Sequence, residues 1–285
     1  MRPPDVLRLV TLAALWGGSF LFLRIAAPVL GPLFVAELRL AVAATTLLAW
    51  AWMTGAQVRF AGRWRAYLVV GTVNSAVPFA LFAYAAVHLP ASYSAVLNAT
   101  SPLFGALFAA LWLNERLTLR RVSGLVAGMA GVALLVGFGP VAADAKVVLA
   151  ALAAIGAACC YALAVVYTRL KTASIEPFAV AVGSQVGAAL VLSPALAPWP
   201  SVELFTAGVV ASVLALAVAC TAFAYVLYFR LIANVGAARA LTVTFLIPVF
   251  GVLWGVLFLG EPLSLFMLAG GVLVIGATWL VVGET

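Results

Sequence analysis

Glu37 and Arg39 are two charged residues inside one apolar run, 33–53. Charged side chains are costly in lipid, so they need a partner or a polar cavity. The two positions point to nearly opposite faces of a helix, so these residues do not pair with each other. Arg24, at a similar depth, is a candidate partner for Glu37. Two interpretations stay open: either residue faces a cavity, where the arginine could bind a substrate carboxylate, or both snorkel and pair structurally.

Uncharged polar residues interrupt several other apolar runs. They either line a binding site or form hydrogen bonds between helices. Asn98 and Thr244 stand out because each lies four residues before a proline, Pro102 or Pro248. A proline lacks an amide donor and leaves a carbonyl free, so a site near mid-membrane is expected there. The polar candidates for substrate binding are Asn74, Asn98, Ser101, Gln185 and Thr244.

Aromatic residues in the same runs are candidates for the wall of a binding site. They offer apolar, stackable surfaces, and tyrosine adds a hydroxyl group. Trp and Tyr also collect at membrane interfaces, so Tyr84, near the end of a run, is alternatively an anchor. The aromatic candidates are Trp16, Phe79, Tyr84, Tyr161 and Tyr225.

The elements that must position these residues follow from the composition. The 285-residue chain is 67% hydrophobic and 8% charged, with a mean hydropathy of +1.24, which indicates an integral membrane protein. Each apolar run is long enough to cross a bilayer core of about 30 Å. Backbone amides in lipid need internal partners, and strict alternation is lacking, so the runs are expected to be helices. The ten expected helices are 6–28, 33–53, 66–87, 91–113, 119–138, 147–169, 175–196, 204–231, 236–259 and 264–282.

The positive charges are distributed according to membrane topology. The net charge is +7, and most Lys and Arg residues fall in the connections that would lie inside if both termini are cytoplasmic. Arg24 and Lys146 fall on the outer side. We therefore expect no nucleic-acid partner, and we expect a multi-pass membrane protein with both termini cytoplasmic.

The chain contains an internal repeat. Residues 102–117 read PLFGALFAALWLNERL, and residues 248–263 read PVFGVLWGVLFLGEPL. We predict two domains of five helices each, 1–140 and 141–285. Because five is odd, the second unit is inverted relative to the first, an arrangement typical of carriers whose central site opens to alternate sides.

Proline and glycine recur in this repeated helix. Pro102 and Pro248 are expected to kink or hinge the fourth and ninth helices, and Gly105 and Gly251 permit close approach to a neighbour. The alternative is close packing without motion. Each copy ends in a glutamate, Glu115 or Glu261, which either caps a helix or acts as a gate or proton site. The fifth and tenth helices, which carry little besides glycine, are expected at the periphery.

These motifs together resemble the drug/metabolite transporter superfamily, in its bacterial EamA-like branch with two duplicated five-helix domains. The stretches that carry the resemblance are LWGGSFLFLR, PLFVAELRL and both copies of the repeat. The resemblance implies a ten-helix bundle around a central cavity. It also implies export of a small molecule without ATP hydrolysis, with amino acids, aromatic ones included, as the expected substrates.

No enzyme or cofactor motif is found. Walker, HExxH and GxSxG sequences and metal-ligand clusters are missing from the sequence, so we expect a transporter, with no cofactor, rather than an enzyme. Export of drugs or other metabolites, a lipid-handling role and a passive channel are the alternatives. The expected partners are a small-molecule substrate and membrane lipids, and the chain is expected to be a monomer or a homodimer through its fifth and tenth helices.

Overall fold

The computed structural model describes residues 2–112, 118–138, 141, 144–197, 199–236, 240 and 242–282, and the regular structure in these residues is entirely helical. Eight helical stretches are long and apolar enough to cross a membrane, and two shorter apolar helices follow them. The prediction of an all-helical membrane protein with ten spans is confirmed. The elements, in chain order, are α1 (Pro3–Leu30), α2 (Pro32–Thr54), α3 (Trp64–Gly71), η1 (Thr72–Ala76), α4 (Val77–His88), α5 (Ala91–Asn98), α6 (Ser101–Trp112), α7 (Leu119–Phe138), α8 (Ala145–Lys171), α9 (Pro177–Leu192), η2 (Ser193–Leu196), η3 (Val202–Leu204), α10 (Ala207–Leu214), η4 (Ala215–Phe223), α11 (Ala224–Val235), α13 (Val243–Leu259) and α14 (Leu265–Val282).

Local sequence sets several of these boundaries. Gly31, with φ of 89°, separates α1 from α2, and Pro32 starts α2 at a position where no amide donor is needed. Asp144 caps α8 by accepting a hydrogen bond from the Val147 amide, and Glu176 caps α9 in the same way. These two carboxylates therefore serve the ends of helices rather than the interior of the bundle.

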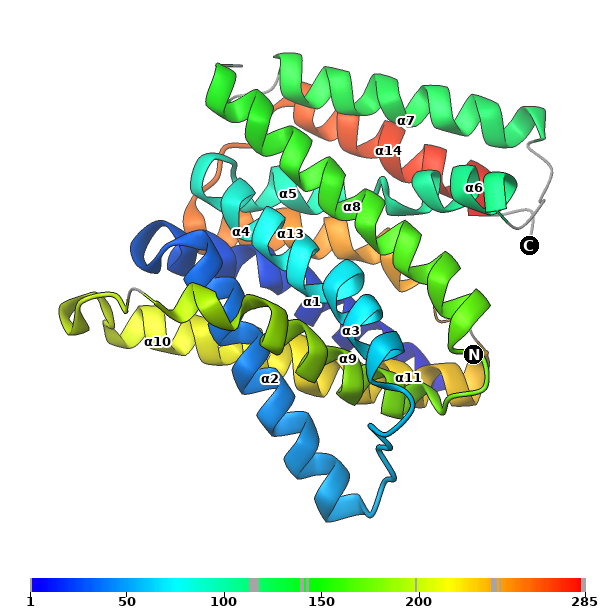
Figure 1. Ribbon diagram of the computed structural model, residues 1–285. Helices are drawn as coiled ribbons and strands as arrows, with labels where there is room; N and C mark the ends of the chain where they lie inside the picture. The colour runs from blue at the N-terminus through cyan, green and yellow to red at the C-terminus, as the bar shows by residue number, and fades with distance from the viewer. Residues whose placement is uncertain are drawn as a thin grey trace.

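The helices α7 and α14 lie side by side at one edge of the bundle (Figure 1). Their contact depends on glycine, because a Cβ atom at Gly131 would lie only 2.8 Å from the Gly270 carbonyl oxygen. These are the fifth and tenth spans, which were expected at the periphery. The dimer contact through them stays a prediction.

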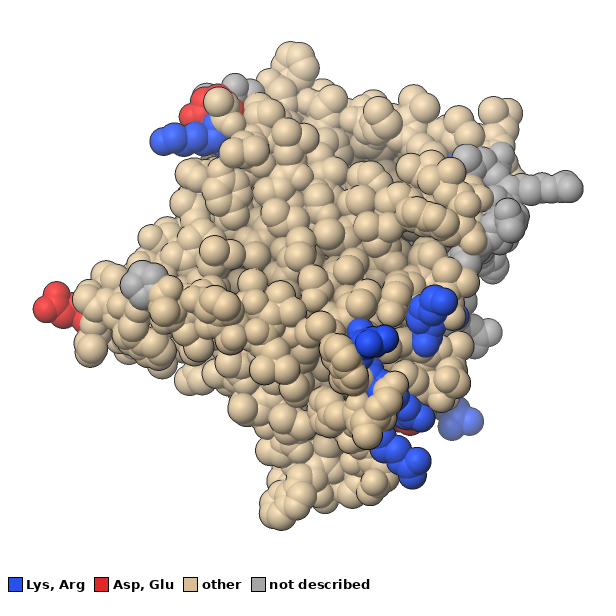
Figure 2. Space-filling view, in the orientation of Figure 1, with Lys and Arg blue, Asp and Glu red and all other residues tan. Residues whose placement is uncertain are grey.

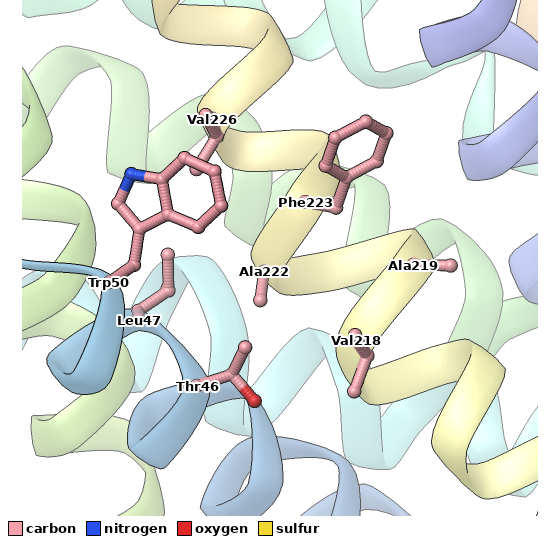
Figure 3. A pocket seen from close by; sticks show the side chains of 8 residues that line it. All are labelled: Thr46, Leu47, Trp50, Val218, Ala219, Ala222, Phe223 and Val226. Carbon is pink, nitrogen blue, oxygen red and sulfur yellow. The ribbon is translucent and has the colours of Figure 1, made fainter. Parts of the chain in front are cut away.

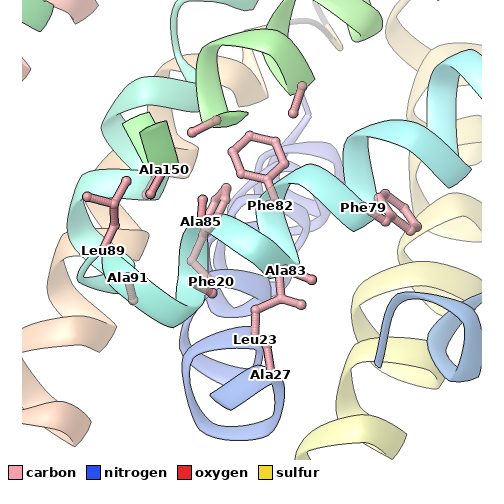
Figure 4. Packing of buried hydrophobic residues seen from close by; sticks show 14 of the residues in the cluster. Phe20, Leu23, Ala27, Phe79, Phe82, Ala83, Ala85, Leu89, Ala91 and Ala150 are labelled. Atoms are coloured by element: carbon pink, nitrogen blue, oxygen red, sulfur yellow. The ribbon is translucent and has the colours of Figure 1, made fainter. Parts of the chain in front are cut away.

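Small and aromatic residues of α1, α4 and α8 form the largest buried cluster (Figure 4). Phe20 and Phe82 meet edge to face, with ring centres 5.3 Å apart, and Ala150 lies beside them in the same cluster. Lipid gives no hydrophobic drive between helices, so such close packing is what holds them together.

The backbones of α3 and α9 touch at two glycines, Gly71 and Gly187. A Cβ atom at Gly187 would lie 2.8 Å from the Tyr67 carbonyl oxygen, and one at Gly71 would lie 2.7 Å from the Ala188 amide nitrogen. Because the two backbones are in contact, a larger side chain at either glycine cannot be accommodated without moving one helix.

The surface shows the separation of charge expected of a membrane protein. On the face in Figure 2, Lys and Arg residues gather toward one end, near the ends of α3 and α8, and a broad uncharged band lies above them. Exposed cations at this end include Arg59, Arg65, Arg169 and Lys171.

Candidate functional site

Arg39 lies in α2 with only 5% of its surface exposed. Its Nε atom donates a hydrogen bond of 2.8 Å to Thr221 Oγ1, and its Cζ atom lies 3.7 Å from the centre of the Phe79 ring. None of the acidic residues that the structure describes forms an ion pair with it. The guanidinium is therefore a buried positive charge whose remaining N–H donors have no protein acceptor in the described part of the chain.

Thr221 belongs to η4, a π-helical segment inside the eighth span. Its hydroxyl donates to the carbonyl of Leu216, five residues earlier, at 2.7 Å, which leaves the oxygen available to accept from Arg39. Such wider turns are rare and often occur at functional sites. The sequence did not indicate Thr221, because a lone threonine in an apolar run usually bonds to its own helix.

A second polar group lies beside the first and joins three spans. Asn74 Nδ2 donates to the Tyr225 hydroxyl at 3.1 Å, and Gln185 Nε2 donates to Ser75 Oγ at 2.8 Å and to the Tyr225 hydroxyl at 3.5 Å. Asn74 and Ser75 lie in η1, the other π-helical segment. Both π-helical segments thus carry hydroxyl or amide groups that contact the helices next to them.

The aromatic candidates surround these polar groups. Tyr161 and Tyr225 lie near Arg39. Tyr161 stacks on Phe82 with ring centres 6.1 Å apart. Six of the predicted residues are therefore brought together in one region, by contact with Arg39 or with one another: Arg39, Asn74, Phe79, Tyr161, Gln185 and Tyr225.

The other two aromatic candidates have different ring partners. Trp16 packs against Tyr228, with ring centres 5.3 Å apart, and Tyr84 meets His88 edge to face near the end of α4. Thr244 lies in the first turn of α13, and its role at a binding site stays a prediction.

Glu37 and Arg24 do not pair with each other. Arg24 donates instead to the carbonyl oxygens of Ala86 and Val87, at 2.7 and 2.8 Å, near the C-terminal end of α4. The hypothesis of an Arg24–Glu37 pair was therefore wrong, since the free carbonyls of a helix end are better placed. Glu37 is 2% exposed, and its Oε2 atom has no hydrogen-bond partner among the described residues.

The two repeated prolines have different surroundings. The fourth span is broken at residues 99–100, just before Pro102, and hydroxyl groups of Thr100 and Ser101 bond to carbonyls of the preceding turn, that of Asn98 included. By contrast, α13 continues through Pro248. A break before the proline is thus seen in the fourth span, and the hinge roles of Pro102 and Pro248 stay predictions.

The repeated glycines also differ. A Cβ atom at Gly105 would meet nothing within 4 Å, whereas Gly251 lies against Ala95 of α5. Gly17 of α1 packs against the Gly251 backbone on the other side. Gly251 therefore serves close packing in this conformation, and the hinge assignments of both glycines stay predictions.

Glu261 connects the two halves of the chain. Its Oε1 atom accepts a hydrogen bond from the Ala91 amide at 2.6 Å, and its Oε2 atom accepts from the amide and hydroxyl of Ser92 at 3.0 and 2.6 Å. We call these three bonds the Glu261 contact. The carboxylate thus caps α5, far away in sequence, while Ser264 caps α14. Its repeat counterpart, Glu115, lies outside the described residues.

A groove of about 250 Å³ lies between α2 and the η4–α11 stretch (Figure 3). Trp50 and Leu47 of α2 face Phe223 and Ala222 across it, and Thr46 contributes a hydroxyl group. The lining is almost wholly apolar. Residues on both sides of Thr221 in the sequence line the groove. The lining does not include Arg39, Thr221 or Phe79.

Comparison with known proteins identifies relatives along the whole chain. The model of the EamA-like transporter family matches residues 5–137 and again residues 148–283. The uncharacterized transporter YvbV of Bacillus subtilis is 28% identical over 96% of this chain and 90% of its own length. An uncharacterized transporter of Archaeoglobus fulgidus is 25% identical over 93% of each chain. A protein of known crystal structure, 21% identical, superposes with a TM-score of 0.68 over 98% of this chain and 96% of its own, and it supports the fold alone.

Proposed function

The chain belongs to the EamA-like transporter family, and on this premise we propose that it exports amino acids, aromatic ones included, across the cytoplasmic membrane by alternating access. It is a multi-pass membrane protein with homologues named as transporters. In the proposed orientation both termini are cytoplasmic, because this places the exposed cations near α3 and α8 on the inner side.

The observation that carries the proposal is the unpaired guanidinium of Arg39. A buried positive charge without a counter-ion is unfavourable, and the cost falls when a ligand supplies the negative charge. The planar guanidinium fits a carboxylate with two parallel hydrogen bonds. Thr221 accepts a hydrogen bond from its Nε atom, and Phe79 covers one of its faces. The terminal N–H groups are therefore left for such a ligand.

The rings around Arg39 support a substrate with an aromatic or otherwise apolar body. Phe79 contacts the guanidinium itself, and Phe82 stacks on Tyr161, which lies near Arg39. Aromatic side chains prefer stacked or edge-to-face neighbours, so this surface would favour a ring over a polar side chain.

The Glu261 contact supports alternating access. In the proposed orientation it lies at the outer side, where it ties α5 of the first unit to the α13–α14 connection of the second. Inverted repeats exchange conformations, so this contact at the outer side is expected to open when the carrier opens outward.

Reconstituted protein provides the test. Liposomes containing the purified protein and unlabelled L-phenylalanine should accumulate labelled L-phenylalanine from outside, saturably and faster than liposomes without internal substrate. Arg39→Gln should abolish this counterflow, whereas Arg65→Gln, which removes an exposed arginine, should not. Flux without saturation or trans-stimulation would indicate a channel, and undiminished counterflow in Arg39→Gln would reject the assigned site.

A further inference from the structure

Gln185 is a fully buried amide whose nitrogen forms hydrogen bonds but whose oxygen does not. It lies in α9 with 0% of its surface exposed. Its nitrogen donates to the hydroxyl groups of Ser75 and Tyr225, at 2.8 and 3.5 Å. Its oxygen, Oε1, is buried and has no partner in the described part of the chain. A buried acceptor without a donor is unfavourable, so this atom has capacity for a ligand N–H group.

Contacts to one shared span connect Gln185 with Arg39. Arg39 bonds to Thr221, and Gln185 approaches Tyr225, four positions further along the same span. Thr221 lies in the wider turns of η4 and Tyr225 in α11, and positions four apart on this span lie on roughly the same side, about one turn or 5 Å apart. The carboxylate and amino groups of an α-amino acid can span such a separation when each adds a hydrogen bond of about 3 Å.

We propose that Gln185 determines specificity by accepting a hydrogen bond, through Oε1, from the amino nitrogen of an α-amino acid whose carboxylate is bound by Arg39. This assignment rests on the proposed function and extends it. It divides the recognition of the substrate between a charged donor for the carboxylate and an uncharged acceptor for the amine.

The acidic residues that the structure describes do not supply an alternative acceptor for the amine. Five of them lie at helix ends or in connections. Glu37 alone lies within a span, and it points away from Arg39 because the two are only two positions apart on α2. A single amino acid bound to Arg39 therefore meets the Gln185 amide rather than a carboxylate. The five are Asp5, Asp144, Glu176, Glu203 and Glu261.

Analogues that lack an amino group test the assignment. In the counterflow assay with labelled L-phenylalanine, 3-phenylpropionate keeps the carboxylate and ring but has no donor for Oε1, and phenylpyruvate presents an acceptor instead. A site built to bond an N–H group strongly rejects such analogues. Both should compete at least about tenfold more weakly than unlabelled L-phenylalanine with the unmodified protein.

Gln185→Met keeps the length of the side chain and removes the acceptor. In this variant 3-phenylpropionate should compete almost as strongly as L-phenylalanine. Most of the tenfold preference for L-phenylalanine should therefore be lost. Ser75→Ala is the matched control, because it removes the partner of the Gln185 nitrogen and leaves Oε1 in place. It should lower flux but keep the preference. An equal loss of preference in both variants would show a structural role only and overturn the assignment.

Gln185→Glu decides the question if Gln185→Met fails to fold. It retains an acceptor oxygen and adds a negative charge, so phenethylamine, a cation without a carboxylate, should compete more strongly than with the unmodified protein. Unchanged competition by phenethylamine would overturn the assignment. If Gln185→Met transports L-phenylalanine and still prefers it over 3-phenylpropionate, the role of Gln185 is refuted but the proposed function stands. If the unmodified protein shows no flux, both the proposed function and the role of Gln185 are refuted.

Discussion

Arg39 and Thr221, 182 positions apart, are joined by a hydrogen bond of 2.8 Å between the first and second halves of the chain. The threonine can accept this bond because its own proton is directed to a carbonyl five residues earlier. The π-helical turn of η4 thus presents an acceptor to Arg39. An ordinary helical turn would direct the same hydroxyl to a different carbonyl.

Thr221→Val should weaken transport without unfolding the protein. It removes the acceptor for Arg39 Nε, and a hydrogen bond to a charged group contributes about 1.5 kcal/mol, so we expect about a tenfold loss of affinity for L-phenylalanine. Thr45→Val is the control, because the Thr45 hydroxyl is exposed and bonds only to its own helix. Equal affinities of the two variants in counterflow would contradict the role of Thr221.

Arg39→Lys should also be defective, although it keeps the charge. A lysine ammonium cannot form two parallel hydrogen bonds with a carboxylate, nor can it stack flat on Phe79. We expect the half-saturating concentration of substrate to rise about tenfold or more, with the thermal midpoint in detergent little changed. A variant with the affinity of the unmodified protein would show that charge alone suffices.

Glu261→Gln should loosen the outer side. The amide nitrogen of glutamine cannot accept from Ala91 or Ser92, so part of the Glu261 contact is lost. In a variant whose native cysteines are replaced, Ser94→Cys reports access, because Ser94 is 1% exposed and lies one turn into α5. An impermeant maleimide should label it severalfold faster after Glu261→Gln, but not after Glu203→Gln in the η3 connection.

Gly187→Leu should destabilise the protein strongly. The added side chain would meet the Tyr67 backbone, and overpacking of this kind costs about 1–3 kcal/mol or more. The thermal midpoint in detergent should fall by several degrees or the protein should fail to fold. Gly208→Leu should have little effect, because a Cβ atom there meets nothing within 4 Å.

The inverted arrangement can be tested at the two ends of α8. Lys146 lies in its first turn and Lys171 at its last residue, so they are on opposite sides of the membrane in the proposed orientation. In intact cells, an impermeant reagent should label Lys146→Cys but should label Lys171→Cys only after the membrane is opened. Labelling of both from one side would refute the topology.

The spans could be predicted from the sequence because hydropathy is a local property of the chain. The same is true of Arg39 and Gln185, whose polarity is conspicuous in apolar runs. Thr221 could not be found in this way, because its importance depends on a π-helical turn that tertiary packing produces. The partners in the Glu261 contact could not be predicted either. The glutamate was expected to cap a helix or act as a gate, but its partners lie 169 and 170 positions away.

The direct contact of the α3 and α9 backbones limits how this carrier can change shape. Because the backbones touch at Gly71 and Gly187 and the Tyr67 ring lies against Gly183, the two helices should not slide past each other but travel as a single rigid unit. Ser75, just beyond α3, and Gln185, on α9, would keep their hydrogen bond throughout such a movement. The amide would then meet the substrate in the same orientation from either compartment, and only the route to it would differ.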